Sequence, residues 1–173
     1  VNQQAKLEME LAKDIHILTS QKRLETIARD FVEHYSEIWT TGKAMCVCIN
    51  KVTAVRMFNL AQKYWALKIK EIESSLATAS QQEYMEINRK LEWMKNTEMA
   101  VIISQEQNEI ATFEKWGLDI RSHRSKMEKR EMDKEFKDSE NPLRIVFVCA
   151  MWFTGFDVKS LATIYLDKPL KAH

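Results

Sequence analysis

The order of apolar and polar residues predicts helices at the start of the chain. Residues 1–41 carry apolar side chains at three- and four-residue steps, a spacing typical of amphipathic helices. Thr19-Ser20 is expected to separate two helices and to cap the second, and Gly42 is expected to end it as a left-handed residue. The apolar positions are Leu7, Leu11, Ile15, Leu18, Leu24, Ile27, Phe31, Tyr35 and Ile38. We interpret residues 1–41 as a helical lead-in.

Four short apolar runs farther along the chain predict buried strands. They occupy residues 43–49, 99–104, 145–148 and 163–166. They lack the alternation of a half-exposed strand, which favours a parallel sheet that is covered on both faces. A polar residue and a helical pattern follow the first two runs, as in half of a βαβ unit. The pattern therefore predicts an α/β fold with a mainly parallel sheet of four or more strands, flanked by helices.

Three further helical segments are predicted between these strands. Residues 67–96 are charged, contain no Gly or Pro, and keep a helical stripe that is interrupted at 74–82, so we interpret them as a helical insertion. This insertion could dock other subunits or simply cover the core. A helix is expected from 106 to 114, ending near Gly117, and another over 122–136, where basic and acidic residues are interleaved.

Composition restricts the functions that the chain can have. Lys and Arg number 26 against 25 Asp and Glu, so any contact with nucleic acid has to come from a local patch or from backbone amides. The apolar runs are far shorter than the ~18 residues of a membrane span, and no secretory signal is recognisable. Cys46, Cys48 and Cys149 fall inside predicted strands, which favours core thiols in a reducing cytoplasm over a disulfide or half of a metal site.

One turn after a predicted strand carries candidate chemistry. Thr154-Gly155-Phe156-Asp157 follows the third strand, and it brings a hydroxyl, a glycine and a carboxylate to that point of the chain. Ligands of parallel α/β sheets bind at the carboxyl ends of the strands. The sequence therefore indicates a ligand-binding turn at residues 154–157.

The segment around this turn resembles motif V of superfamily 2 helicases, in the form found in the motor (R) subunit of type I restriction endonucleases. The similarity runs from about Arg23 to the last residue, with matching order and spacing. The matching stretches are Met151–Asp157 (MWFTGFD), Tyr165–Pro169 (YLDKP), Lys43–Asn50 (KAMCVCIN), Met99–Glu109 (MAVIISQEQNE) and His123-Arg124, the last without an assigned role.

This resemblance implies that residues 42–173 are most of a second RecA-like lobe, lacking a final helix with motif VI and carrying the insertion at 67–96. The full-length protein would be an ATP-dependent, type I site-specific deoxyribonuclease that needs ATP and Mg²⁺. No Gly-rich phosphate cradle and no acidic Asp-Glu box occur in the sequence, so the fragment alone is expected to be inactive.

The resemblance also implies the partners of the chain. They are double-stranded DNA, the first RecA-like lobe and nuclease domain of the same parent chain, and the methyltransferase and specificity subunits of the complex. The expected location is the cytoplasm of a bacterium or archaeon, without membrane contact.

The resemblance to motif V implies roles for three residues. Gly155 and Asp157 would face the ATP cleft and couple it to DNA, and Thr154 would hold the DNA backbone. Asp157 could instead cap the turn that follows it.

By resemblance the first strand and the loop after it are motif IV, and this motif and the end of the second strand imply four further contacts with the DNA backbone. Asn50 and Lys51 follow the first strand, and Ser104 and Gln105 follow the second. Phosphate contacts from short polar side chains suit these positions. The alternatives are a helix cap at Asn50, a solvated Lys51 and a helix cap at Ser104. No catalytic residue and no metal ligand is expected in the fragment.

Two other functions remain open from the sequence. The chain could be a non-catalytic interaction module with a RecA-like fold, or the lobe of another superfamily 2 DNA remodeller. Agreement outside motif V, at Met99–Glu109 and Lys168-Pro169, favours the type I family.

Overall fold

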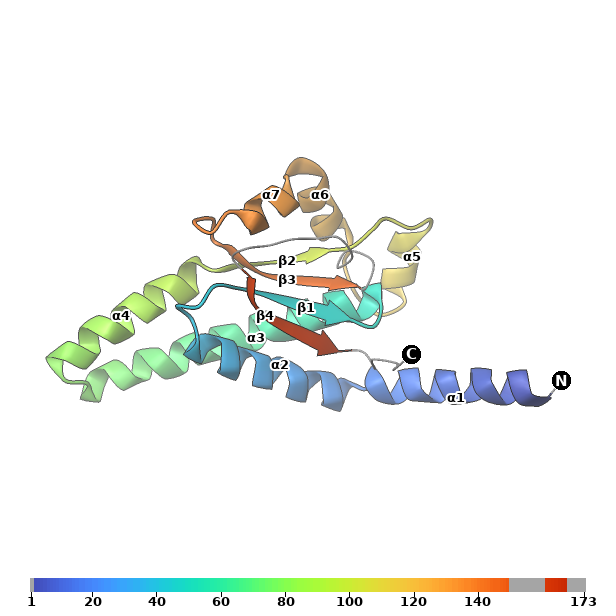
Figure 1. The fold of residues 1–173 in the computed structure, drawn as a ribbon, viewed down its shortest axis with the longest axis horizontal. Coiled ribbons are helices and arrows are strands. Elements are labelled where there is room, and N and C mark those ends of the chain that lie inside the picture. Colours follow the sequence, from blue (N-terminus) through green and yellow to red (C-terminus); the bar gives the residue numbers. More distant parts are fainter. Residues whose placement is uncertain (1, 150–160, 168–173) are drawn as a thin grey trace.

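The computed structural model of this chain describes residues 2–149 and 161–167. Helices and strands alternate along most of it, as Figure 1 shows. The elements are α1 (Asn2–Leu18), α2 (Gln21–Glu37), β1 (Lys43–Cys48), α3 (Lys51–Ser75), η1 (Leu76–Thr78), α4 (Gln81–Asn96), β2 (Glu98–Ile102), α5 (Glu109–Glu114), α6 (Arg121–Lys129), α7 (Met132–Lys137), β3 (Leu143–Cys149) and β4 (Leu161–Asp167).

The four strands form one sheet in the order β2-β3-β1-β4, and every neighbouring pair is parallel. Cys46 in β1 is paired with Phe147 in β3 on one side and with Tyr165 in β4 on the other. All six residues of β1 are buried, because this strand is central and both faces of the sheet are covered. The predicted parallel α/β architecture is confirmed.

Helices cover the two faces of the sheet as separate layers. Cys46 and Cys48 point into the core that α2, α3 and α4 complete, whereas Met45 and Val47 point to the opposite face. There they meet side chains of α7, chiefly Phe136. Figure 1 shows α2 and α3 on one side of the strands and α6 and α7 on the other. The alternation of side chains along a strand explains this division.

The break between the first two helices lies where it was predicted. The Ser20 hydroxyl accepts a hydrogen bond from the Arg23 backbone N–H at 3.4 Å, so Ser20 caps α2. The prediction for Gly42 is wrong, because α2 already ends at Glu37. Gly42 has a φ of 135° and stands directly before β1, where its carbonyl accepts a hydrogen bond from the Tyr35 hydroxyl at 2.6 Å.

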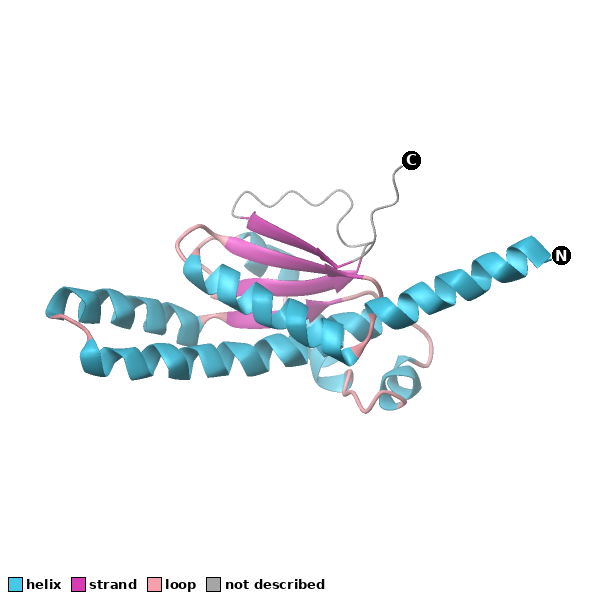
Figure 2. Cartoon of the chain, turned by 90° about the horizontal axis from the view of Figure 1, so that it is seen from below, coloured by secondary structure: helices cyan, strands magenta, loops and turns pink. Residues whose placement is uncertain are grey.

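The segment interpreted as an insertion is part of a long helical hairpin. Helix α3 runs without interruption from the carboxyl end of β1 to Ser75, and α4 returns to β2. Ser80 and Glu83 form a capping box at the start of α4, which explains the break predicted over residues 74–82. Near the sheet, the Trp65 indole donates to the Met94 carbonyl at 2.9 Å. The far end of the hairpin projects beyond the sheet (Figures 1 and 2).

Two predicted helices have different bounds in the structure. The helix expected over 122–136 is divided into α6 and α7, because Arg130 is extended (φ −125°, ψ 149°) and its guanidinium pairs with Glu98 and Glu135. The helix expected from residue 106 starts only at Glu109, after Asn108 in a left-handed conformation with φ 58°.

Helix α1 has no buried residue, although its sequence is amphipathic. Leu7 is 62 % exposed and Leu11 is 45 % exposed. The helix extends away from the rest of the chain in Figure 2. None of the helices in the described ranges is both long and apolar enough to cross a membrane.

Candidate functional site

The carboxyl ends of β1, β2 and β3 meet at one edge of the sheet around a cavity of about 710 Å³. Three of the predicted DNA-contact residues line this cavity: Asn50 and Lys51 after β1, and Ser104 after β2. Other described residues that line it are Ile49, Val52, Ile102, Ile103, Glu106, Thr112, Phe113 and Cys149. The parallel sheet therefore brings residues more than fifty positions apart to one site.

Asn50 holds the first turn of α3. Its backbone is extended, and its side-chain oxygen accepts a hydrogen bond from the Thr53 backbone N–H at 2.7 Å. The predicted cap is confirmed, and the amide N–H₂ of the same side chain remains a potential donor for a ligand.

Lys51 is paired with a residue that the sequence analysis did not single out. Its Nζ lies 2.7 Å from Glu106 Oε1, with the lysine side chain 20 % exposed and the glutamate 60 % exposed. A cation in the first turn of a helix opposes the helix dipole, and the first turn of α3 has no acidic residue. Helix stability therefore does not explain Lys51, whereas a negative partner in front of the turn does.

Ser104 is exposed at the carboxyl end of β2. The alternative interpretation as a helix cap is wrong, because α5 starts at Glu109 and Asn108 occupies the position before it. Ser104 thus lines the same cavity as Lys51 without capping a helix.

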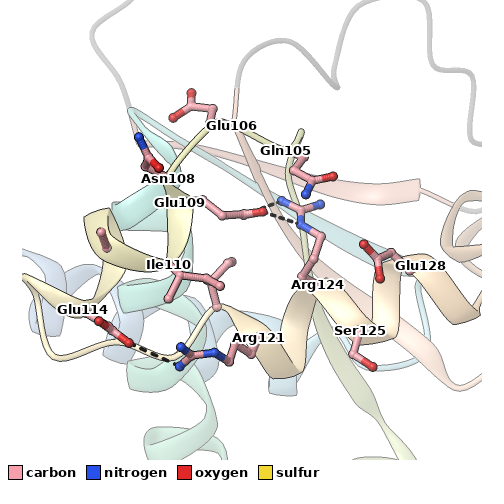
Figure 3. Close-up of a pocket in the computed structure, with 12 residues that line it drawn as sticks. Gln105, Glu106, Asn108, Glu109, Ile110, Glu114, Arg121, Arg124, Ser125 and Glu128 are labelled. Atoms are coloured by element: carbon pink, nitrogen blue, oxygen red, sulfur yellow. Dashed lines mark hydrogen bonds and ion pairs between the residues drawn. The ribbon is translucent and has the colours of Figure 1, made fainter.

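Gln105 belongs to a neighbouring cavity and not to the one that Ser104 lines. This second cavity has a volume of about 600 Å³ and lies between α5 and α6 (Figure 3). Glu109 and Arg124 also line it. Of the four predicted contacts that follow β1 and β2, three therefore line one cavity, whereas Gln105 lines the other.

Arg124 joins two elements at this second cavity. Its Nε and one terminal nitrogen each donate to the Glu109 carboxylate at 2.9 Å, and the other terminal nitrogen donates to the Ile103 carbonyl at 3.0 Å. The neighbouring His123 packs edge-on against Phe58 at a centroid distance of 4.7 Å, and burial lowers the pKa of His123. Sequence reasoning gave the His123-Arg124 pair no role because both partners of Arg124 lie on other elements.

Cys149 is half-buried at the end of β3 and lines the first cavity. Burial raises the pKa of the Cys149 thiol, while the nearby Lys51 lowers it by a smaller amount. Cys46 and Cys48 are buried in the core, as predicted. Across residues 2–149 and 161–167, no group of three or more His, Cys, Asp or Glu side chains is arranged to hold a metal ion.

The residues predicted for motif V, namely Thr154, Gly155 and Asp157, lie outside the described residues. Their roles stay predictions.

Fold and site define an α/β domain whose parallel sheet presents polar side chains at its carboxyl edge. The chain belongs to the family described as type I restriction enzyme subunit R domain 3, whose family model matches residues 33–173.

Curated relatives point to the same family. The chain is 31 % identical, over 91 % of its length, to the type I restriction enzyme HindI endonuclease subunit of Haemophilus influenzae. It is 30 % identical, over 94 % of its length, to the putative type I restriction enzyme MjaIXP endonuclease subunit of Methanocaldococcus jannaschii. In both cases it spans only 12 % of the relative. No solved structure gives a significant match.

Proposed function

We propose that the chain is part of the ATP-dependent DNA translocation motor of a type I restriction endonuclease. In this motor it supplies motif IV and motif V to the contact with the DNA backbone and to coupling with the ATP cleft. The observation that supports this most strongly is the convergence of Asn50, Lys51 and Ser104 on one cavity at the carboxyl edge of the sheet.

The chemistry of these three side chains suits phosphate and not bases. An ammonium, a hydroxyl and an amide are donors that commonly contact the backbone of nucleic acids without reading their sequence. A motor that moves along DNA needs contacts of this kind, because it has to grip every sequence. The N-terminus of α3 adds a favourable field for an anion at the same place.

Lys51 has to change partner when a phosphate binds. In the absence of DNA, Glu106 neutralises its ammonium group at 2.7 Å. A phosphate that enters the cavity would replace Glu106, and the glutamate, which is 60 % exposed, would turn into solvent. Exchange of one surface ion pair for another requires little free energy, so such a grip can be made and released repeatedly.

Coupling to ATP would come from residues outside the described ranges. By resemblance, Gly155 and Asp157 face the cleft between this lobe and the first lobe, and Thr154 holds DNA beside Ser104. ATP and Mg²⁺ would be bound chiefly by the first lobe of the same parent chain. Opening and closing of the cleft would then move the grip along the duplex as a hinge motion.

The proposed partners follow from this placement. They are double-stranded DNA, the first RecA-like lobe and the nuclease domain of the parent chain, and the methyltransferase and specificity subunits, all in the cytoplasm of a bacterium or archaeon. The 173-residue chain by itself would have no ATPase or nuclease activity.

Binding of the chain to a labelled 30-base-pair duplex tests the DNA contact. With a near-neutral net charge the affinity is expected to be weak and strongly dependent on salt. Lys51→Ala should lower it about 3- to 10-fold and reduce the salt slope by about 1. Lys70→Ala is the matched control, because Lys70 is exposed on the same helix, roughly 28 Å along its axis. Equal effects of the two substitutions would contradict the proposed site.

A non-catalytic interaction module is the second candidate, and one observation favours it. Tyr84 and Met85, near the far end of the α3–α4 hairpin, are 49 % and 65 % exposed. Exposed apolar side chains of this kind occur at protein interfaces. In that case Lys51→Ala would leave DNA binding unchanged, whereas substitution of Tyr84 and Met85 by serine would weaken assembly with the other subunits.

A further inference from the structure

The loop between β2 and α5, residues 103–108, carries two polar residues that line the first cavity together with Lys51. Ser104 lines the cavity, and Glu106 reaches the Lys51 ammonium at 2.7 Å. Residues 103–106 belong to no helix or strand, and Asn108 adopts a left-handed backbone with φ 58°. A loop of this kind needs contacts from elsewhere to keep one conformation.

Side chains of α6 supply these contacts at both ends of the loop. Arg124 donates to the Ile103 carbonyl at 3.0 Å, at the beginning of the loop, and to both Glu109 carboxylate oxygens at 2.9 Å, directly after it. The Ile103 backbone N–H in turn donates to the Met127 sulfur at 3.4 Å. Both backbone hydrogen-bonding groups of the first loop residue are thus held by α6.

The geometry requires a guanidinium group. From one planar group Arg124 donates two hydrogen bonds to the Glu109 carboxylate, one to the Ile103 carbonyl and one, at 3.5 Å, to the Met127 sulfur. A lysine ammonium would keep the charge, but it would not form the two parallel bonds to Glu109 together with the bond to Ile103. The side chains of Arg124 and Glu109 are 15 % and 9 % exposed, so water replaces these bonds poorly.

We propose that Arg124 is a positioning residue for DNA contact: by tying Ile103 to Glu109 it holds the loop in the conformation that presents Ser104 to a backbone phosphate. This inference rests on the proposed function, because it names what sets the geometry of the same site. Arg124 does not touch DNA in this account. Its effect is transmitted through the loop, since a loop that is already ordered loses less freedom when it binds.

A second ion pair between the same two helices provides a control. Arg121 and Glu114 also join α6 to α5, at 3.3 Å, but their side chains are 65 % and 58 % exposed (Figure 3). Arg121 donates to Asp119 and Glu114, neither of which belongs to the loop. A general loosening of α6 from α5 would follow from loss of either pair. Loss of loop positioning would follow only from changes at Arg124.

The test measures DNA-stimulated ATP hydrolysis over a range of duplex concentrations, in an R subunit that carries this sequence. Arg124→Lys is expected to raise the duplex concentration for half-maximal stimulation about 5-fold, which corresponds to one lost hydrogen bond, with little change in the maximal rate. Arg121→Lys should change neither quantity more than about 2-fold. In the Ser104→Ala background, Arg124→Lys should have no further effect on the half-maximal concentration, because the hydroxyl that it positions is gone.

The outcomes separate the two claims. If Ser104→Ala and Lys51→Ala leave the dependence on duplex unchanged, the proposed function fails. If these two weaken it but Arg124→Lys does not, only the positioning role is overturned. If the effects of Arg124→Lys and Ser104→Ala on the half-maximal duplex concentration simply add, the positioning role is likewise overturned. Arg124 would then have a structural role only. Should Arg124→Lys fail to fold in thermal melting, Glu109→Gln replaces it and is expected to act in the same direction.

Discussion

At the scale of single residues, the pairing of Lys51 with Glu106 determines how strongly the site attracts an anion. The glutamate is 60 % exposed, so the pair adds little to the stability of the fold. It does cancel the positive charge that a phosphate would meet. Glu106 therefore competes with DNA for the same cation.

Removal of this competitor should strengthen DNA binding. Glu106→Gln is expected to raise the affinity of the chain for a 30-base-pair duplex about 2- to 5-fold at low salt, with a melting temperature within about 2 °C of the unchanged chain. Fluorescence anisotropy gives the affinity. Glu114→Gln is the control for a general change of charge. Glu114 ends α5, which follows the loop, and it is paired with Arg121. An unchanged or lower affinity of Glu106→Gln relative to this control would show that Glu106 does not compete for Lys51.

Lys43 is a buried residue whose charge reduces the stability of the fold. It is 2 % exposed at the start of β1, where its Nζ donates to the Glu135 carbonyl at 3.0 Å and lies 5.3 Å from the centroid of the Phe136 ring. Desolvation lowers the pKa of Lys43 from 10.5 to about 8, against the opposing effect of Asp138. Between these two pH values the unfolded chain binds more protons than the folded chain, so the contribution of Lys43 to stability rises with pH.

The pH dependence of this contribution can be measured by comparing the unchanged protein with the Lys43→Met variant. The free energy of unfolding in urea, relative to Lys43→Met, should increase by about 1–3 kcal/mol as the pH rises from about 8 to about 10.5. Comparison with Lys43→Met removes the titration of other groups. Parallel pH profiles for the two proteins would mean that Lys43 is not desolvated in the folded chain.

At the scale of elements, the cap of α3 and the proposed DNA contact share one side chain. The Asn50 oxygen accepts from the Thr53 N–H, and its amide group faces the cavity edge in the proposal. Substitution by alanine would remove both functions at once. Serine retains the cap but not the reach of the amide.

Asn50→Ser and Asn50→Ala should therefore separate stability from binding. The alanine variant is expected to lose about 1 kcal/mol of stability in thermal or urea unfolding. The serine variant is expected to lose roughly a few tenths of a kcal/mol. Both should bind duplex DNA several-fold more weakly. If DNA affinity instead follows stability, with Asn50→Ser binding like the unchanged chain, Asn50 is a cap and nothing more.

Most elements could be predicted because their signals are local. Short apolar runs predicted the four strands, and Ser20, Asn50 and the break near Ser80 marked helix starts through their own side chains. The division of the 122–136 segment was not predictable in this way. It depends on Arg130 reaching Glu98, which is 32 residues away in sequence.

The same distinction applies to the candidate site. Asn50, Lys51 and Ser104 were predicted because the family resemblance places DNA contacts after the first two strands. Their convergence agrees with the rule that the carboxyl ends of parallel strands meet at one edge. Glu106, Glu109 and Arg124 were not, because their roles come from the path of a loop and from contacts 15 and 21 residues apart. His123-Arg124 matched the family, but nothing in the local sequence indicates which residues Arg124 contacts.

At the scale of the whole molecule, the chain combines a buried parallel sheet with helices that extend beyond it. Helix α1 buries no residue, and the α3–α4 hairpin ends in exposed apolar side chains. The net charge is +1, so attraction to DNA has to be concentrated at the sheet edge. The chain spans about one eighth of the curated relatives that it matches, so its proposed activity depends on the larger protein.

The central claim is that this lobe couples the ATP cleft to the DNA track. The most direct test is DNA-stimulated ATP hydrolysis by an R subunit that carries this sequence, compared with the same subunit bearing Asp157→Ala. We expect stimulation by DNA to fall at least about 100-fold, while the variant stays folded and still binds duplex. Unchanged turnover in a folded variant would contradict the coupling role and favour the interaction module instead.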